Sequence, residues 1–371
     1  MAAARIAVLG AGGFLGSHLV PRLLELGDVQ VYAIDQDLHK LECRDPRVKR
    51  RVARLEQPGL IEEVTAQSSV ILSLTALCTP ALYNTDPLAV IDANYTELLP
   101  LVRASARHGA RLIHFSTCEV YGRRSLDLTG LPRETMNEEA NALFLGPVHN
   151  ERWTYACAKQ LLERVIYAHG AHGNLNYTIV RPFNVIGPRM DYMPGVDGDG
   201  VPRVLACFMA ALLRGEDLQL VDGGQQRRSF IAVDEFCAGV LRIVERGEAC
   251  REEIINLGNP QNDVTIRELA RALADEYAGY TGQPRARLRD VSAAEFYGAG
   301  YDDTPVRVPD ISKARRLLGF EPCTSLAEML PGIVRDYVRR YGQTSSYDQT
   351  SSYGENTIRP ANPAKFALKA V

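Results

Sequence analysis

A glycine-rich segment between two short apolar runs constrains the fold of this chain more than any other feature. The run Arg5–Leu9 reads as a buried strand that leads directly into Gly10-Ala-Gly-Gly-Phe-Leu-Gly16, and a helix with leucines at helical spacing follows. A second apolar run, Val29–Ile34, ends in Asp35. This order predicts a βαβ unit that binds a dinucleotide, because a strand, a glycine-rich turn, a helix and a second strand that ends in an acidic residue follow one another.

Each glycine of this turn has a predicted role. Gly10 permits the tight turn, Gly13 lets the backbone approach a pyrophosphate, and Gly16 lets helix and strand pack closely. The helix N-terminus suits the phosphates because its first N–H groups have no partners within the helix. Asp35 would accept hydrogen bonds from an adenosine ribose and repel a 2′-phosphate, so we predict NAD rather than NADP. The other residues predicted at the cofactor site are Phe14, Leu15, Leu74 and Pro182.

Alternating strand and helix patterns continue beyond this unit and predict an α/β fold. We expect a Rossmann-like, doubly wound parallel sheet with a smaller mixed α/β substrate-binding domain. Residues 1–181 are assigned to the NAD-binding domain, to which residues 229–258 return. Residues 182–228 and 259–341 are assigned to the substrate-binding domain. Residues 342–371, which contain a short polar repeat, are predicted to be a weakly structured tail.

The composition excludes several classes of function. The 371 residues are 46% hydrophobic and 23% charged, with a formal net charge of -3 and no basic block, so we expect no nucleic-acid partner. No apolar run approaches the roughly 20 residues of a membrane helix, so we expect no membrane partner. The eight cysteines are scattered without a C-x-x-C pair, which argues against a zinc site or a disulfide framework. We therefore predict a cytoplasmic protein without a metal site.

Polar groups follow the apolar run Arg111–Phe115 in close succession. Thr117, Cys118 and Glu119 bring a hydroxyl, a thiol and a carboxylate to the end of a predicted strand, where open α/β sheets bind ligands. The stretch alone would equally fit a polar loop with one free thiol.

A second strand end carries Cys78, which could face the same crevice or be a buried structural thiol. Tyr83, in the loop that follows, could reach a substrate.

Tyr155 and Lys159 lie four residues apart and share one face of a predicted helix, with Arg152 one turn earlier. An ammonium near a phenol stabilises the phenolate and lowers the pKa of the tyrosine, which makes it usable as a base. Such spacing also arises by chance on solvated faces. Together with the glycine turn and the Thr117 hydroxyl, it favours an oxidoreductase site.

The glycine turn, Thr117, Tyr155-x-x-x-Lys159 and Arg181-Pro-Phe-Asn184 together resemble the extended short-chain dehydrogenase/reductases that act on nucleotide sugars. The chain is most similar to the UDP-glucuronic acid decarboxylase group, and within it to the UDP-apiose/UDP-xylose synthases, over about residues 5 to 340. The strings that carry this closer resemblance include Arg111–Gly122, Gly187–Asp191, Gly200–Phe208 and Gly300–Asp303. The resemblance implies NAD as cofactor and a UDP-sugar as substrate.

The resemblance also implies roles for individual residues. Thr117, Tyr155 and Lys159 would form the oxidoreductase triad, in which Tyr155 takes the proton of the sugar C4 hydroxyl as hydride passes to NAD. Glu119 and Arg307 match an acid/base pair around the sugar carboxylate and C5. The residues predicted to bind the substrate, four of them matched to UDP or its diphosphate, are Tyr83, Arg152, Asn184, Arg203, Arg228 and Tyr301.

The resemblance also bears on two cysteines, on two positions at which this chain differs from its relatives, and on the oligomeric state. Cys78 and Cys118 match the two thiols that the apiose-forming members place near the sugar. Gln219 stands where relatives carry a lysine near the uridine, and Arg54-Leu55 departs from the usual acidic adenine contact. The predicted long helices 88–108 and 153–169 are paired in family members, so we expect a homodimer.

The expected reaction is oxidation of UDP-glucuronic acid at C4, which gives a β-keto acid that loses carbon dioxide without a metal. The product is UDP-xylose, the UDP-4-keto-pentose, or UDP-apiose after ring contraction. A 4,6-dehydratase would need an acid where Cys118 stands, and Glu119 with Arg307 argues against a 4-epimerase that keeps the carboxylate. A NAD sensor without turnover is disfavoured by the intact triad.

Overall fold

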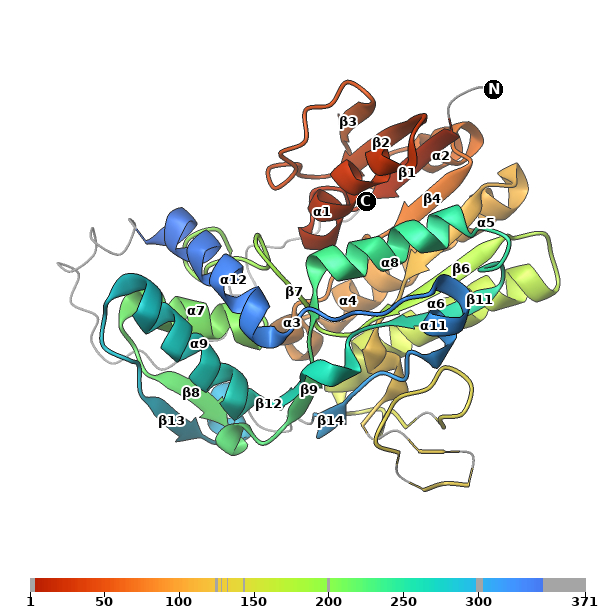
Figure 1. Cartoon of the computed structure of the whole chain (residues 1–371). Coiled ribbons are helices and arrows are strands. Elements are labelled where there is room, and N and C mark those ends of the chain that lie inside the picture. The colour runs from red at the N-terminus through yellow and green to blue at the C-terminus, as the bar shows by residue number, and fades with distance from the viewer. Residues whose placement is uncertain are drawn as a thin grey trace, which may run out of the picture.

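The computed structural model describes residues 4–342, apart from 124, 125, 128, 132, 143, 199, 200 and 298–302. The predicted tail beyond Gly342 and the predicted substrate residue Tyr301 lie outside the described residues. The described chain has a larger part built around a central sheet and a smaller part that contains α7 (Val204–Arg214), α9 (Ile266–Thr281) and α12 (Leu326–Tyr341) (Figure 1).

Seven parallel strands form the central sheet in the order β11-β6-β5-β4-β1-β2-β3. This confirms the predicted Rossmann-like sheet. The strands are β1 (Ala4–Leu9), β2 (Val29–Asp35), β3 (Val48–Val52), β4 (Val70–Ser73), β5 (Arg111–Phe115), β6 (Tyr177–Pro182) and β11 (Glu253–Leu257). Leu9 of β1 pairs with Ile34 on one side and with Ser73 on the other. The strand order therefore reverses beside β1, and ligands bind in the crevice that such a reversal opens at the carboxyl ends.

Helices cover both faces of the sheet. Val8 faces the core beneath α1 (Phe14–Leu23), α8 (Val233–Glu245) and α11 (Ser312–Leu318), whereas Ala7 faces the core beneath α2 (Leu60–Gln67), α5 (Leu99–His108) and α6 (Thr154–Ala171). Successive strand residues point to opposite faces, so both sets are buried. This explains why the strands read as continuous apolar runs in the sequence.

The prediction of one long helix over residues 88–108 is wrong. The segment forms α4 (Pro87–Asn94), a short 3-10 turn η2 (Thr96–Leu98) and α5. Pro100 stands in the first turn of α5. A proline has no N–H and its ring crowds the preceding turn, so the helix restarts here instead of continuing.

The smaller part has a core of its own. Helices α7 (Val204–Arg214), α9 (Ile266–Thr281) and α12 (Leu326–Tyr341) pack with the parallel pair β8 (Leu218–Val221) and β13 (Leu288–Val291). Thr265 with Glu268 and Ser325 with Glu328 form capping boxes at the starts of α9 and α12.

The described chain also contains shorter elements. Two of them, η3 (Cys118–Tyr121) and η4 (Glu151–Trp153), are 3-10 turns that carry predicted site residues. The others are α3 (Pro80–Thr85), α10 (Ala293–Tyr297), β7 (Val185–Ile186), β9 (Arg227–Ser229), β10 (Ile231–Ala232), β12 (Asp263–Thr265), β14 (Val306–Arg307), η1 (Leu24–Leu26), η5 (Asp222–Gly224) and η6 (Pro260–Asn262).

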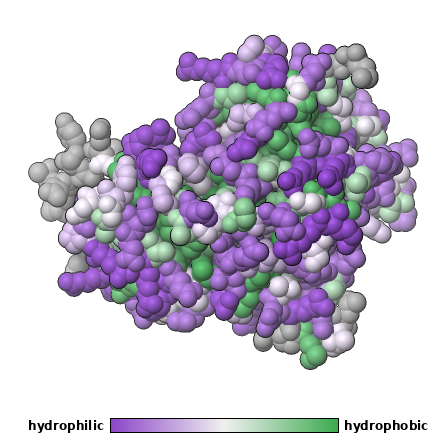
Figure 2. Space-filling model, in the orientation of Figure 1, coloured by the Kyte–Doolittle hydropathy of each residue, from purple (hydrophilic) through white to green (hydrophobic). Residues whose placement is uncertain are grey.

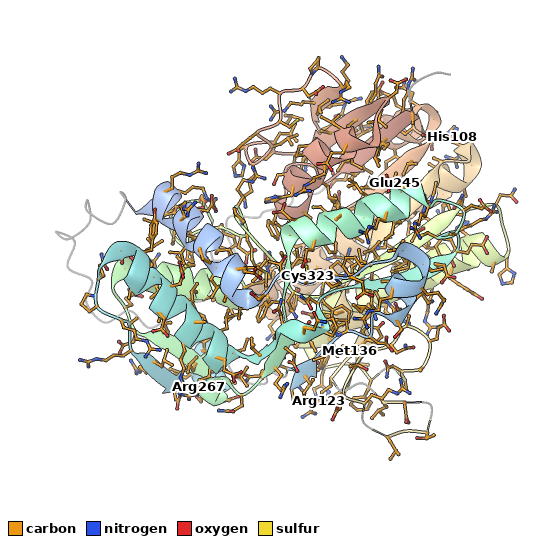
Figure 3. All side chains as sticks on the ribbon, in the orientation of Figure 1. His108, Arg123, Met136, Glu245, Arg267 and Cys323 are labelled. Carbon is orange, nitrogen blue, oxygen red and sulfur yellow. The ribbon has the colours of Figure 1, made fainter. Side chains whose placement is uncertain are left out.

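Hydrophilic side chains cover most of the face shown in Figure 2, with hydrophobic ones visible between them. Figure 3 places Arg267 on α9 of the smaller part, while His108 lies at the end of α5 on the far side of the larger part. Within the described ranges, no helix is both long and apolar enough to cross a membrane.

Candidate active site

The glycine turn after β1 forms a cradle for a dinucleotide. Gly10 has φ +89°, a conformation that favours glycine, and a Cβ at Gly16 would stand 2.2 Å from the Gly10 carbonyl oxygen. A Cβ at Gly13 would meet only that same oxygen, at 3.4 Å. Gly13 also precedes α1 without a side-chain cap, so no N-cap side chain occupies the first N–H groups of α1. The turn therefore fits the pyrophosphate of a dinucleotide cofactor.

Two further residues complete this cradle. The Asp35 carboxylate does not line the cavity described below; it accepts a hydrogen bond from the Gly12 N–H at 2.9 Å, and burial raises the pKa of Asp35. A Cβ at Gly12 would stand 1.7 Å from the Asp37 carbonyl oxygen, so this position requires glycine. Gly12 was not predicted from the sequence, because the residue that requires a glycine at this position, Asp37, lies in the segment after β2. No local pattern shows that this segment packs against Gly12.

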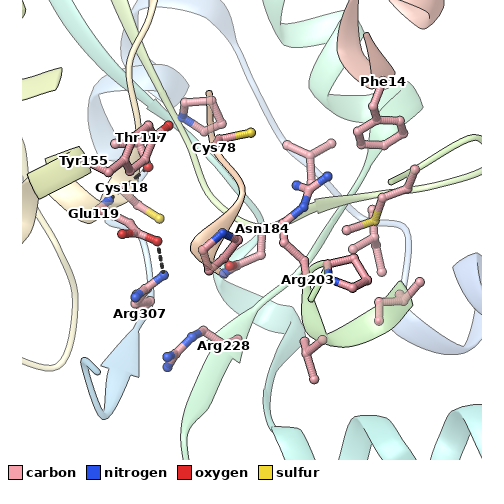
Figure 4. Close-up of a pocket in the computed structure, with 18 of the residues that line it drawn as sticks. Phe14, Cys78, Thr117, Cys118, Glu119, Tyr155, Asn184, Arg203, Arg228 and Arg307 are labelled. Atoms are coloured by element: carbon pink, nitrogen blue, oxygen red, sulfur yellow. Dashed lines mark hydrogen bonds and ion pairs between the residues drawn. The ribbon is translucent and has the colours of Figure 1, made fainter. Parts of the chain in front are cut away.

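One cavity of about 410 Å³ joins the glycine turn to the smaller part. It brings together all but two of the predicted site residues: Asp35 stands beside it, and Tyr301 is not described. Figure 4 shows Thr117, Cys118, Glu119 and Tyr155 gathered on one side of the cavity, with Arg203 and Phe14 on the other. The predicted residues that line it are Gly10, Gly13, Phe14, Leu15, Gly16, Leu74, Cys78, Tyr83, Thr117, Cys118, Glu119, Arg152, Tyr155, Lys159, Pro182, Asn184, Arg203, Arg228 and Arg307.

The three residues of the predicted triad meet in this cavity. Tyr155 lies in the first turn of α6, and the Thr117 side chain hydrogen-bonds it. Lys159, one turn later on the same helix, donates from Nζ to the carbonyl oxygen of Phe115 at 3.0 Å. Burial lowers the pKa of Lys159 to about 8.

The expectation that Lys159 lowers the pKa of Tyr155 is wrong. The pKa of Tyr155 is raised well above its usual value, first by burial and then by the neighbouring Cys78 and Glu119. Burial removes the water that would solvate a phenolate, and a nearby carboxylate opposes a second negative charge. With this raised pKa, Tyr155 is a neutral phenol at neutral pH.

Tyr83, predicted to contact the substrate, packs directly on the triad. It is only 1% exposed, and its ring is stacked on that of Tyr155. The Arg152 guanidinium carbon lies 5.3 Å from the centre of the Tyr83 ring. Tyr83 thus forms part of the cavity wall that holds Tyr155 in place.

Glu119 is held by two arginines that come from different parts of the chain. Its Oε2 accepts from Arg152 Nη1 at 2.6 Å, and its Oε1 accepts from Arg307 Nη1 at 3.2 Å. Burial alone would raise the pKa of Glu119, but the charges of Arg152 and Arg307 outweigh it, so the pKa is lowered. Glu119 is therefore a carboxylate at neutral pH.

A second carboxylate, Asp303, joins this cluster and was given no role from the sequence. Its Oδ2 accepts from Arg228 Nη2 at 2.5 Å and its Oδ1 accepts from Arg307 Nη2 at 2.7 Å, while Arg152 Nη2 lies 3.6 Å away. Against the effect of burial, these three arginines lower the pKa of Asp303 to about 2. Asp303 is the last residue of Gly300–Asp303, one of the segments on which the family resemblance rests. No spacing in the sequence predicts that its side chain lies next to arginines of β9 and η4.

The thiols of Cys78 and Cys118 both line the cavity. Cys118 is buried, and burial raises its pKa. Cys78 keeps surface where it faces the cavity, yet the surrounding protein displaces water and raises its pKa as well. Both groups are therefore neutral thiols at neutral pH, which makes them weak hydrogen-bond donors rather than bases.

The remaining predicted substrate residues reach the cavity from the smaller part and the loop before it. Asn184, with φ 35°, donates from Nδ2 to the Ser229 carbonyl oxygen at 2.9 Å. Arg203 stands at the start of α7, where the Asp191 carboxylate binds it. Gln219 also lines the cavity.

Comparisons with known proteins agree with this architecture. Residues 6–258 match the NAD dependent epimerase/dehydratase family. UDP-D-apiose/UDP-D-xylose synthase 1 of Arabidopsis thaliana is 41% identical over 91% of this chain and 92% of its own length, and the synthase of Oryza sativa subsp. japonica is 42% identical over 88% and 87%. The crystal structure of PbgP3 protein from Burkholderia pseudomallei superposes with a TM-score of 0.80 at 32% identity, covering 92% of this chain and 98% of that one.

Proposed function

We propose that this chain, which belongs to the NAD dependent epimerase/dehydratase family, converts UDP-glucuronic acid by oxidation at C4 and loss of its carboxyl group. The relatives named as UDP-apiose/UDP-xylose synthases support this substrate and this outcome. The observation that carries the proposal is the Glu119–Arg307 ion pair beside Tyr155, because it brings a carboxylate-binding guanidinium to the residue expected to take the C4 hydroxyl proton.

NAD is the cofactor, and the glycine turn with Asp35 would hold it. When bound, it supplies a cationic nicotinamide that accepts hydride from the sugar carbon. Tyr155 would act in its phenolate form, which the positive charges of Lys159 and of a bound nicotinamide would favour. In that form it takes the proton of the C4 hydroxyl, and the Thr117 hydroxyl hydrogen-bonded to Tyr155 orients it for that transfer. Lys159 keeps an ammonium next to this pair up to about pH 8, where its own proton is lost.

Decarboxylation then follows from the chemistry of the oxidised sugar. The C4 ketone is β to the C6 carboxylate, so the C5–C6 bond breaks with its electron pair passing to C5 and the C4 oxygen as an enolate. Arg307 and Arg152 hold the sugar carboxylate, and carbon dioxide leaves without needing a proton. A proton must then reach C5. Because ion pairs keep Glu119 ionised, we assign it to orient the water that delivers this proton.

Three products are open to the UDP-4-keto-pentose. It is released as such, it is reduced to UDP-xylose, or its ring contracts to give UDP-apiose. Cys78 and Cys118 support the last branch, since both line the cavity that would hold the sugar ring. Their neutral state assigns them a donor role rather than that of a base.

We further propose a homodimer that forms through α4 and α6. These helices pack on each other, yet Leu88 is 71% exposed and Leu161 is 45% exposed, together with Ile91 and Tyr167. Exposed apolar side chains on neighbouring helices are typical of an interface between subunits. Light scattering on the wild type should give twice the monomer mass, and Leu88→Arg with Leu161→Arg should give a monomer. A monomeric wild type would contradict the dimer.

The function is tested with UDP-glucuronic acid that carries ¹³C in its carboxyl group. Purified protein with NAD should release the label as carbon dioxide, detected by mass spectrometry of the gas phase. UDP-glucose, which lacks the carboxyl group, is the matched control and should release none. Turnover of the labelled substrate with the label retained in the sugar would refute the proposal.

A further inference from the structure

Arg203, the residue immediately before α7, is held in a fixed orientation by a single carboxylate. Its Nε lies 3.0 Å from both oxygens of Asp191, and its Nη2 donates to Oδ1 at 2.5 Å. The backbone N–H of Arg203 also donates to Asp191 Oδ2, at 3.2 Å. Asp191 therefore fixes both the start of the helix and the plane of the guanidinium.

Asp191 is itself held in a rigid frame. Its φ of 52° lies in the left-handed region, which aspartate and asparagine tolerate better than most residues. Lys40, from the connection after β2, donates from Nζ to the Asp191 carbonyl oxygen at 2.7 Å. On the other side, Tyr337 of α12 donates to the Met190 carbonyl oxygen at 2.7 Å. Contacts from both cores thus determine where the carboxylate of Asp191 stands.

The paired geometry leaves one edge of the Arg203 guanidinium for a ligand. Asp191 engages Nε and Nη2, and among the described residues no hydrogen bond of Nη1 is found. The guanidinium carbon lies 6.0 Å from the centre of the Phe14 ring in the cofactor turn, and Arg203 lines the cavity. A guanidinium whose plane is already fixed loses little freedom when it binds a phosphate, so its affinity is higher than that of a mobile one.

We propose that Asp191 is a positioning residue for the nucleotide-sugar substrate: it holds Arg203 so that the outer edge of the guanidinium receives the diphosphate. This role rests on the proposed function only in that the ligand is a uridine nucleotide. It acts entirely through Arg203, because Asp191 and an anionic ligand repel each other directly.

The test uses calorimetric titration of the full chain with UDP. Asp191→Asn keeps the size of the side chain and its tolerance of a positive φ, but removes the charge that holds Arg203. We expect it to weaken UDP binding by about tenfold or more, as Arg203→Ala does, since one charged hydrogen-bonding contact is lost in each case. The double variant should bind UDP no more weakly than Arg203→Ala alone.

Asp197→Asn is the matched control. Asp197 lies in the same loop and binds Tyr341 and the Met193 N–H, but does not line the cavity. It should leave the Kd for UDP unchanged, and NAD binding should be unchanged in every variant. With UDP-glucuronic acid, Asp191→Asn should raise KM while kcat at saturation stays near the wild-type value. If Asp191→Asn does not fold, Asp191→Gly replaces it, because glycine adopts the same φ without strain.

Unchanged or tighter UDP binding by Asp191→Asn would overturn the role of Asp191. So would a double variant weaker than Arg203→Ala, or an equal loss in Asp197→Asn, since either result would mean that Asp191 acts other than by orienting Arg203. A wild-type protein that does not bind UDP would instead overturn the proposed function, and this role with it.

Discussion

The rings of Tyr83 and Tyr155 lie stacked, with centroids 5.1 Å apart and an angle of 8° between their planes. Tyr83 comes from α3 and Tyr155 from α6, so two separate helices build the surroundings of the reacting phenol. Its position is therefore set by ring packing as well as by the hydrogen bond with Thr117.

Replacing Tyr83 should separate packing from hydroxyl chemistry. Tyr83→Phe keeps the stacked ring and should leave kcat near the wild-type value. Tyr83→Ala removes the ring, and the resulting freedom of Tyr155 should lower kcat by about 10- to 100-fold. The same variant should lose roughly 3–5 kcal/mol in the free energy of unfolding, measured with urea. Equal rates for wild type and Tyr83→Ala would refute the packing role.

Tyr155→Phe should abolish reduction of NAD by the sugar, because the variant has no hydroxyl to take the C4 proton. We expect a loss of roughly 10²–10⁴-fold in the rate at which reduced cofactor appears in absorbance. The variant should still bind NAD in calorimetry. Tyr280→Phe, on the exposed surface of α9, is the control and should keep full activity. Normal turnover by Tyr155→Phe would show that another residue is the base.

Lys159 gives the stability of the protein a particular pH dependence. Burial lowers its pKa from 10.5 to about 8, so between these values the folded protein has lost a proton that the unfolded chain still binds. Stability then rises with pH across this window. The difference in free energy of unfolding between wild type and Lys159→Met should increase by about 3 kcal/mol from pH 8 to pH 10.5. If this difference in the free energy of unfolding fell as the pH rose, the pKa of Lys159 would be raised in the folded protein instead of lowered.

The pair Glu163–Arg181 anchors α6 to the end of β6. Arg181 Nε and Nη2 donate to the two oxygens of Glu163 at 3.0 and 2.6 Å, and both residues are buried. Glu163→Gln leaves a buried guanidinium without its counter-charge and should cost roughly 3–5 kcal/mol in urea unfolding. Glu163→Leu combined with Arg181→Met should recover most of that loss. A double variant as unstable as Glu163→Gln would argue against a charge effect.

The fold and most of the cavity lining could be predicted because they depend on local patterns. Gly10, Gly16 and the Tyr155–Lys159 spacing each encode their geometry within a few residues. The break before α5 was missed because apolar periodicity outweighed the single signal of Pro100.

Asp303 and Asp191 could not be given roles from the sequence for a different reason. Each acts on an arginine that another element brings close: Asp303 meets Arg228 from β9, and Asp191 meets Arg203 at the start of α7. Such pairs depend on how the two parts of the chain pack, which periodicity does not encode. The pKa of Tyr155 depends on the same packing, since burial decides its direction.

The most direct measurement is the NMR spectrum and mass of the product formed from UDP-glucuronic acid and NAD in deuterated water. Decarboxylation followed by protonation at C5 predicts either a UDP-pentose that is lighter than the substrate by one carbon dioxide or a UDP-4-keto-pentose that has lost two further hydrogens. Each product carries one deuterium on the carbon that was C5 of the substrate. The same spectrum identifies xylose, apiose or the keto sugar. A UDP-hexuronic acid of unchanged carbon count with inverted C4 would contradict the account.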